Sequence, residues 1–439
     1  FIMFVLTVTP LIRDSQAQSK GNIHALPLPV GSGARALGQG GAFIAVADDA
    51  TAASWNPGAL IQLERPEISL VGSYLSTQQD FNPGSSGFSF SDEEVSRGDL
   101  NYASVAYPFR VFGKNLVAAL NYQQIYDFHS DIKFNQSEHF DYGYITFDRN
   151  IDTVFNAQGG VGALTPAISG LIMPKLAMGV AINFYTDEFF DNYAWKETTK
   201  QTGRGNLGTT SFTEESNIEL TYKNFQAVNA AVGVLWDVWE KEDKRLTFGA
   251  VYKTPYTAGT DRIYKKKTEL LMMGRSYEEN LRIREHFETA YPMSLGAGLG
   301  FRYNDALSFS SDVTWTDWSE WKQTDENGVK VTPLGSTRTS TNANDTYAIK
   351  CGSEYLIFGK KVIVPVRGGV FYDPRPSLRD PTDVYGFSVG SGITFKRFSL
   401  DGAYQFRWAN NVDGEDIGLS GTHYDQTEHI FLTSIIVYF

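Results

Sequence analysis

The feature that most constrains this sequence is the alternation of short and long connections between its strand-length segments. Beyond residue 65, alternating polarity marks roughly 14 such segments, an even number. Short turns on one side and long loops on the other are typical of an outer-membrane β-barrel. The expected strands are 66–76, 99–108, 114–127, 152–165, 175–187, 224–238, 244–258, 286–303, 305–317, 343–358, 361–373, 384–396, 398–409 and 427–439. The expected long loops are 77–98, 128–151, 188–223, 259–285, 318–342 and 410–426, with 374–383 the shortest of the set.

The two faces of the expected strands differ in composition. In 399–408, Leu400 and Phe406 share one face, whereas Asp401 and Gln405 lie on the other. Elsewhere the second face is mostly glycine, serine and threonine. A soluble sandwich also alternates, but its outward face would carry more charge. We therefore expect an all-β fold, a single-chain transmembrane antiparallel barrel whose lumen is partly filled by a plug.

Composition narrows the class of protein further. The formal net charge of −12 argues against a nucleic-acid partner. The single cysteine, Cys351, cannot form an intrachain disulfide, and its phase places it toward lipid. The last residue, Phe439, ends an apolar strand, which is typical of barrels that the outer-membrane assembly machinery recognises.

The N-terminal region divides into two parts. Residues 1–17 combine a short apolar run with a small-x-small pattern, which indicates a signal peptide whose basic region is missing. Residues 18–64 form the expected hatch, and 65–439 the outer-membrane barrel. Within the hatch, Asp49 is an expected N-cap for a short helix over 50–55, which Pro57 ends. This segment has too few apolar residues to fold alone.

Several motifs carry a resemblance to a known family. The hatch contains G-A-R-A-L-G-Q-G-G-A, then A-D-D-A-T-A and W-N-P, and the C-terminal half contains W-T-D-W-S and R-G-G-V-F-Y-D-P-R-P. These resemble the FadL/TodX family of outer-membrane long-chain fatty-acid transporters. That family usually has alanine at the position of Gly58 and serine at that of Arg375. The resemblance covers both ends of the chain and leaves 128–285 unaligned.

The resemblance implies a mechanism of passive uptake. Extracellular loops would capture a long-chain fatty acid or similar hydrophobic molecule, a luminal pocket would bind it, and a wall defect near the third strand would release it sideways. That strand, 114–127, contains no glycine or proline to mark such a defect. The hatch would block the direct route. Its expected gating residues are Gly33, Arg35, Gly40, Gly41, Asp48, Asp49, Asn56, Pro57 and Gly58.

A carboxylate ligand would require a cation in the lumen. By phase, Arg302, Arg367 and Arg407 point inward and are the expected substrate-binding residues. The alternative is that they pair with hatch or wall carboxylates, namely Asp48, Asp312 and Asp401. Arg35 is expected to anchor the plug to the wall.

No arrangement of residues indicates an enzyme. The six histidines are scattered without metal-ligand spacing, so we expect no catalytic residue, metal or cofactor. The run Lys265–Lys267 is either a contact to lipopolysaccharide phosphates or a solvated charge run. Three other functions stay open: a surface-protein shuttle or anchor for a secretion system, a diffusion porin and a secreted soluble β-protein. The hatch argues against the porin, and the connection pattern against the soluble protein.

Overall fold

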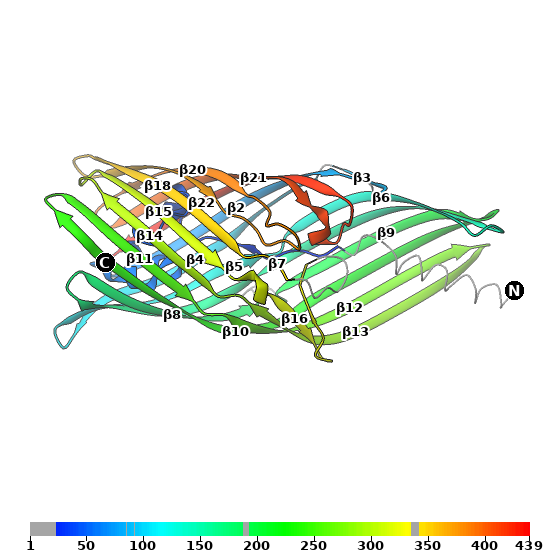
Figure 1. Cartoon of the computed structure of the whole chain (residues 1–439), viewed down its shortest axis with the longest axis horizontal. Coiled ribbons are helices and arrows are strands. Elements are labelled where there is room, and N and C mark those ends of the chain that lie inside the picture. The colour runs from blue at the N-terminus through cyan, green and yellow to red at the C-terminus, as the bar shows by residue number, and fades with distance from the viewer. Residues whose placement is uncertain (1–22, 85, 92, 188–192, 335–341) are drawn as a thin grey trace.

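A closed antiparallel barrel of 14 strands forms the body of the protein in the computed structural model (Figure 1). The structure describes residues 23–84, 86–91, 93–187, 193–334 and 342–439. The expected signal peptide lies outside the described residues. The barrel closes where the last strand pairs with the first, with Glu67 opposite Tyr438. In order around the wall the strands are β2 (Glu67–Asn82), β4 (Glu93–Val111), β5 (Lys114–Asp127), β7 (Thr146–Met173), β8 (Leu176–Asp187), β10 (Thr210–Lys241), β11 (Lys244–Lys253), β14 (Ser294–Arg302), β15 (Leu307–Thr316), β18 (Thr346–Phe358), β19 (Ile363–Tyr372), β20 (Tyr385–Thr394), β21 (Phe398–Asp413) and β22 (His423–Tyr438).

The wall has apolar side chains on its outer face and polar side chains on its inner face, as a barrel in lipid requires. Leu70, Val105 and Val389 are about half exposed on the outside, as lipid-facing side chains would be. Cys351 is also exposed there, as its phase predicts. Asp312 and Arg367 are buried in the lumen. Closure pairs the backbone groups that lipid could not solvate, so this strand number is stable only as a barrel.

A second sheet continues from the barrel beyond the membrane, and we call it the external sheet. The long strands β7 and β10 belong to both: their C-terminal halves lie in the wall and their N-terminal halves in the external sheet. Figure 1 shows this sheet extending past one end of the barrel. Its other strands are β3 (Phe88–Phe90), β6 (Ser130–Asp141), β9 (Trp195–Leu207), β12 (Tyr256–Met272), β13 (Arg275–Tyr291), β16 (Lys322–Asp325) and β17 (Lys330–Val331).

The observed strands correct the expectation of long loops at 77–98, 128–151, 188–223 and 259–285. These connections are mainly strands, in which side chains alternate between buried and exposed positions. Their inner face includes polar side chains such as Glu214 and Ser216, which hides the strand pattern in the sequence. The expected strand 286–303 is also two strands, because Pro292 cannot continue the ladder between β13 and β14.

The segment before the wall lies in the barrel lumen. It contains β1 (Leu28–Pro29), α2 (Ala34–Gly38), α3 (Ala52–Trp55) and the 3-10 helix η1 (Pro57–Gln62). Thr51, and not the expected Asp49, is the N-cap residue of α3, and no side chain caps the helix. Asp49 Oδ1 instead accepts a hydrogen bond from Thr51 N at 2.9 Å, just before the helix. Two further 3-10 helices are η2 (Trp318–Glu320) and η3 (Gly414–Ile417). Among the described residues, none of the helices has the length and apolar character to span a membrane.

Candidate functional site

The segment 31–63, which we call the plug, packs directly against glycines on the inner face of the wall. A Cβ atom on Gly233 of β10 would lie 2.0 Å from Asn56 Oδ1, and one on Gly179 of β8 would lie 2.3 Å from Pro57 O. Across the lumen, a Cβ on Gly369 would lie 2.3 Å from the nitrogen of Gly40. Real Cβ atoms do not approach this closely, so the wall glycines give the plug backbone direct access to the strands. This accounts for the glycine-rich second face seen in the sequence.

The turn at Asn56, Pro57 and Gly58 is bonded to both plug and wall. Asn56 Nδ2 donates to the carbonyl oxygens of Ile44 and Val234, each at 2.9 Å, while its Oδ1 accepts from Gly58 N at 3.0 Å. A Cβ on Gly58 would lie 2.7 Å from the carbonyl oxygen of Gly233. Glycine rather than the alanine usual in the resembling family therefore fits this close approach.

Backbone conformation explains three other hatch glycines. Gly33, Gly40 and Gly41 have φ angles of 86°, 67° and 75°, in the left-handed region. Side chains rarely adopt this conformation, so glycine is required for the chain to turn before and after α2.

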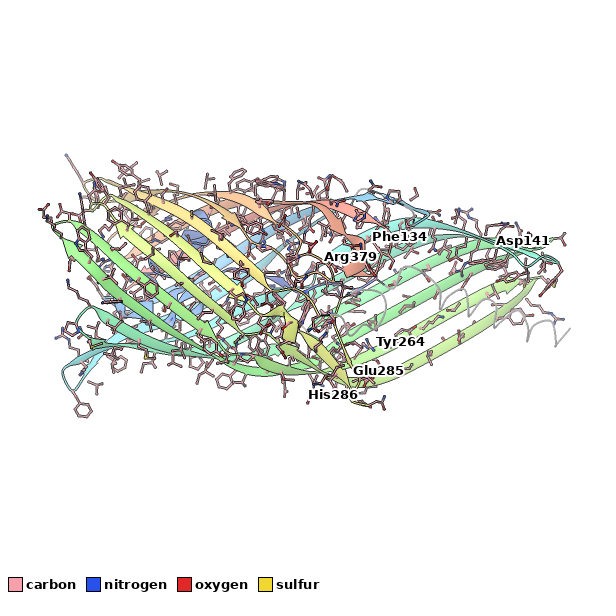
Figure 2. The ribbon with its side chains drawn as sticks, in the orientation of Figure 1. Phe134, Asp141, Tyr264, Glu285, His286 and Arg379 are labelled. Carbon is pink, nitrogen blue, oxygen red and sulfur yellow. The ribbon has the colours of Figure 1, made fainter. Side chains whose placement is uncertain are left out.

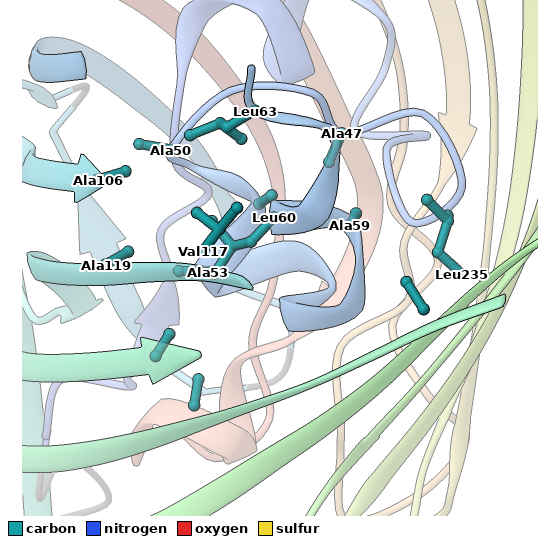
Figure 3. Close-up of a cluster of buried hydrophobic side chains, with 14 of the residues drawn as sticks. Ala47, Ala50, Ala53, Ala59, Leu60, Leu63, Ala106, Val117, Ala119 and Leu235 are labelled. Atoms are coloured by element: carbon teal, nitrogen blue, oxygen red, sulfur yellow. The ribbon is translucent and has the colours of Figure 1, made fainter. Parts of the chain in front are cut away.

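Small apolar side chains pack the periplasmic side of the plug against the wall. Figure 3 shows plug alanines and leucines facing side chains from several strands. The labelled plug residues are Ala47, Ala50, Ala53, Ala59, Leu60 and Leu63, and the wall residues are Ala106, Val117, Ala119 and Leu235. Such short side chains let the two backbones come close while still excluding water.

An ion-pair network that is buried at its wall end joins the plug to the wall. Arg35 bonds Asp48 within the plug and donates to Glu354 Oε1 of β18 at 2.8 Å. Arg367 of β19 donates to Glu354 Oε2 at 2.6 Å and to Asp401 Oδ1 at 2.5 Å. Buried charges are tolerated when paired in this way, and Arg35 therefore links the plug to the wall.

Two wall carboxylates bind plug backbone amides directly. Asp312 Oδ2 accepts from the amides of Phe43 at 2.6 Å and Ile44 at 2.9 Å. Glu67 accepts from Ala50 N, whose carbonyl oxygen accepts from Tyr102 at 2.7 Å. The plug is therefore held by specific polar contacts in addition to apolar packing.

The three arginines expected to bind substrate lie in different surroundings. Arg367 is fully engaged in the ion-pair network above. Arg407 lies 3.3 Å from both Asp373 and Glu428. Arg302 is exposed at the end of β14, opposite Arg245. The structure thus brings Arg367 together with Arg35 and leaves Arg302 at the rim, and their role toward a substrate stays a prediction.

A cluster of stacked aromatic rings fills the barrel mouth above the plug. Trp195 lies between Phe128, at 4.2 Å between ring centroids, and Tyr222, at 4.0 Å. Tyr256 stacks on Tyr185 at 4.6 Å and on Tyr291 at 4.8 Å. Five of the rings come from β8, β9, β10, β12 and β13, and Phe128 lies between β5 and β6, so the junction of barrel and external sheet builds the cluster.

A cavity of about 360 Å³ opens beside this cluster. Seven phenylalanine, tyrosine and tryptophan side chains and two charged ones contribute to its lining: Phe128, Trp195, Tyr222, Tyr264, Phe287, Tyr291, Trp321, Glu197 and Arg262. Arg262 is already paired with Glu285 of β13, through its Nε at 2.9 Å. Figure 2 shows Glu285 and His286 on β13, near the junction of the external sheet with the barrel. The lining therefore combines aromatic rings with polar groups, and its cation is engaged by a carboxylate of the external sheet.

Glu197 is the buried acid of this cavity. One oxygen accepts from Ala25 N at 3.2 Å, and the other from the Tyr222 hydroxyl at 3.5 Å. Burial raises the pKa of the Glu197 carboxyl to about 7. Glu197 lies on β9, outside the membrane-spanning wall, and titrates near neutral pH.

A break in the wall lies next to the cavity. The ladder between β4 and β5 ends at Tyr102 and Gln123. Beyond that point β5 pairs with β1, with Leu28 opposite Asp127, and Val30 N donates to Ile125 O at 3.0 Å. The N-terminal segment therefore takes the place of β4 along this part of β5, and we call this position the β4–β5 slot.

Comparison with known proteins identifies the family. The sequence matches the family of outer membrane transport proteins OMPP1/FadL/TodX over residues 15–428. The chain belongs to the FadL/TodX family. The family consists of outer-membrane transport channels for hydrophobic compounds, not of enzymes, and places the chain in the bacterial outer membrane. No curated protein sequence matches the chain.

Solved structures share the fold of this FadL/TodX protein at low sequence identity. A FadL homologue of Pseudomonas aeruginosa has a TM-score of 0.59 at 14% identity, covering 95% of this chain and 100% of its own. The Pseudomonas putida toluene transporter TodX has a TM-score of 0.54 at 12% identity, with coverage of 95% and 100%. The Ralstonia pickettii toluene transporter TbuX has 0.51 at 14% identity, with 93% and 98%. At these identities the likeness shows the fold alone.

Sequence reasoning missed the cavity of this FadL/TodX protein. Many of its lining residues come from connections expected to be loops, and others come from the expected hatch and the expected strand 286–303. The strand pairing between β9, β10, β12 and β13 brings most of them together. One signal was present, because aromatic residues such as Trp195, Tyr222 and Phe287 recur where those connections meet the expected wall. The domain bounds at 17 and 64 stay predictions.

Proposed function

We propose that this protein takes up long-chain fatty acids or similarly hydrophobic molecules passively and releases them sideways into the outer membrane. The observation that carries the proposal is that one short segment contacts both the cavity and the wall break. Ala25 and Pro27 line the cavity, and Leu28 and Pro29 pair with β5 in the β4–β5 slot.

The cavity suits a ligand held mainly by apolar contact. Burying apolar surface contributes about 25 cal/mol per Å², and stacked rings line much of this cavity. A carboxylate ligand would have to compete with Glu285 for Arg262 and would lie near Glu197. Apolar contact rather than ion pairing is therefore expected to supply most of the affinity.

The slot supports sideways release. A ligand that enters the cavity pushes against the segment 25–27, whose continuation holds the slot closed through two paired residues and the Val30 amide. Displacing those few hydrogen bonds exposes a lateral path between β4 and β5. The direct route is blocked by the plug, whose contacts with the wall are far more extensive.

A reversible cross-link tests the route. In a Cys351→Ser background, Leu28→Cys with Asp127→Cys places one cysteine on each side of the β1–β5 pair. We expect oxidation to stop oleate uptake by cells without another transporter, and reduction of the same variant to restore it. Thr394→Cys with Ser399→Cys is the matched control, because these residues pair across β20 and β21, away from the slot. Oxidation of this control should leave uptake unchanged. Equal uptake by the oxidised and reduced forms would exclude release through the slot.

Ligand binding is measured separately by native mass spectrometry of the purified protein in detergent. Oleate and toluene are the probes, since two of the similar structures are toluene transporters by name. Stoichiometric binding of either supports uptake and identifies the preferred class. Binding of neither at high micromolar concentration would overturn the proposal and favour the shuttle or anchor for surface proteins.

A further inference from the structure

Positive side chains gather on the outward face of the external sheet. Three cross-strand rows run over β9, β10, β12 and β13, and each places its residues on the same face. The rows are Lys200–Asn217–Lys267–Asn280, Thr198–Glu219–Lys265–Arg282 and Lys196–Thr221–Ile263–Arg284. We call their six cations the basic patch: Lys196, Lys200, Lys265, Lys267, Arg282 and Arg284.

The patch is a local group of cations in an acidic protein, and it ends at an acidic row. The next row on the same face has three carboxylates and is Thr202–Glu215–Glu269–Glu278. Glu219 is the single carboxylate in the three rows, whereas the chain as a whole has a formal net charge of −12. Glu219 accepts from Lys196 and Lys265, each at 2.7 Å, and these bonds lower its pKa to about 2. Glu219 therefore stays ionised and holds two of the six cations in place.

Three patch cations are available to an external anion. Arg284 pairs with Asp261 at 2.8 Å, but Lys200, Lys267 and Arg282 have no ion pair within the described part of the chain. Lys267 and Arg282 line an open hollow of about 370 Å³, whose other polar lining includes Asn217, Asn280 and the Glu219–Lys265 pair. Ammonium, guanidinium and amide donors around one hollow are the groups that bind phosphate oxygens.

The distance of the patch from the membrane surface indicates which phosphate groups can reach it. On β10 the outward apolar band runs from Val238 to Val228, and the rows cross the same strand at Asn217, Glu219 and Thr221. At about 3.3 Å per residue and a tilt of about 40°, the rows lie roughly 20 to 30 Å above the edge of this band. Phospholipid headgroups lie at that edge, and sugars of the outer leaflet extend above it.

We propose that the basic patch binds the phosphorylated core sugars of lipopolysaccharide. Lys200, Lys267 and Arg282 contact the phosphates, and Asn217 and Asn280 donate to neighbouring oxygens. The site is separate from the transport path, because the patch residues lie on the outward face and the cavity on the inward one.

The test is a binding titration of the purified full chain in detergent. Rough lipopolysaccharide with a phosphorylated inner core is the probe, and the same material after chemical dephosphorylation is the comparison. The triple variant Lys200→Gln, Lys267→Gln and Arg282→Gln is expected to weaken binding of the phosphorylated form by about tenfold or more. Dephosphorylated material is expected to bind weakly to every variant.

A charge-matched control separates the patch from net charge. Lys114→Gln, Lys241→Gln and Lys361→Gln remove three exposed cations at the opposite turns, and binding should stay within about twofold of the parent. Glu219→Gln removes a negative charge from the patch. It should tighten binding several-fold, because it frees Lys196 and Lys265. A gain of this kind cannot arise from misfolding.

Three outcomes would overturn the proposal. The first is equal loss in the patch and control triple variants, which would indicate a net-charge effect. The second is equal binding of phosphorylated and dephosphorylated lipopolysaccharide. The third is full displacement by inorganic tripolyphosphate at equal concentration, which would make the patch a site for small free phosphates.

Discussion

Gly233 on the barrel wall and Asn56 in the plug approach so closely that a Cβ atom on Gly233 would lie 2.0 Å from Asn56 Oδ1. Asn56 is also the residue that bonds the wall carbonyl of Val234 at 2.9 Å. The plug therefore fits the wall both because Gly233 has no side chain and because Asn56 forms a hydrogen bond with the wall backbone.

Gly233→Ala should dislodge the plug without breaking the barrel. The added methyl group forces Asn56 away from the wall, and overpacking of this kind costs about 1–3 kcal/mol. We expect higher ion conductance in planar bilayers with normal heat-modifiable gel mobility. Gly402→Ala is the matched control, since a Cβ there meets nothing within 4 Å. Equal conductance of the two variants would show that the contact does not hold the plug.

Arg367→Met should destabilise the whole protein, because it leaves Glu354 and Asp401 as buried carboxylates with fewer partners. Removing one partner of a buried ion pair costs about 3–5 kcal/mol. The midpoint of thermal unfolding in detergent, followed by gel mobility, is the measurement. Arg302→Met, at an exposed rim position, should change stability by about 0.5 kcal/mol or less. Normal stability of Arg367→Met together with loss of oleate binding would instead assign Arg367 a ligand role.

Trp195→Ala should weaken ligand binding by about tenfold, because the ligand loses apolar contact with a ring of the cavity lining. A tenfold change in affinity corresponds to about 1.4 kcal/mol. Trp195→Phe keeps an aromatic ring between Phe128 and Tyr222 and should recover most of the affinity. Trp236→Ala removes a lipid-facing tryptophan and should leave affinity unchanged. Affinities come from titration with oleate or toluene, whichever binds. Unchanged affinity in Trp195→Ala would place the ligand outside this cavity.

The wall and its closure could be predicted from sequence because period-2 alternation and turn placement are local signals. All 14 wall strands overlap an expected segment. The glycine-rich face at Gly298 and Gly390 also indicated a filled lumen, which the plug contacts now explain.

The external sheet and the cavity could not be predicted for a physical reason. The inner face of that sheet includes Arg149, Glu138 and Glu214, which are buried as an ion-pair group, with Arg149 Nη2 2.8 Å from Glu138. Polar residues on the covered face remove the alternation that marks a half-buried strand. The pairing of Arg367 with Asp401, by contrast, is the alternative that the sequence left open for the inward-facing arginines, and the structure shows it.

Glu197 should make the protein less stable as pH rises through neutrality. Its folded-state pKa of about 7 lies above the ordinary value of 4.5, so the native state binds more protons than the unfolded state between these values. Stability therefore falls as pH increases from about 5 to 8, by on the order of 3 kcal/mol at most. Glu197→Gln keeps the shape and removes the titration, so its unfolding midpoint should vary less with pH. The comparison of both proteins at pH 5, 6, 7 and 8 isolates the contribution of Glu197, since all other titrating groups are common to both. Identical pH profiles would show that the carboxyl is solvated in the cavity and titrates at its ordinary value.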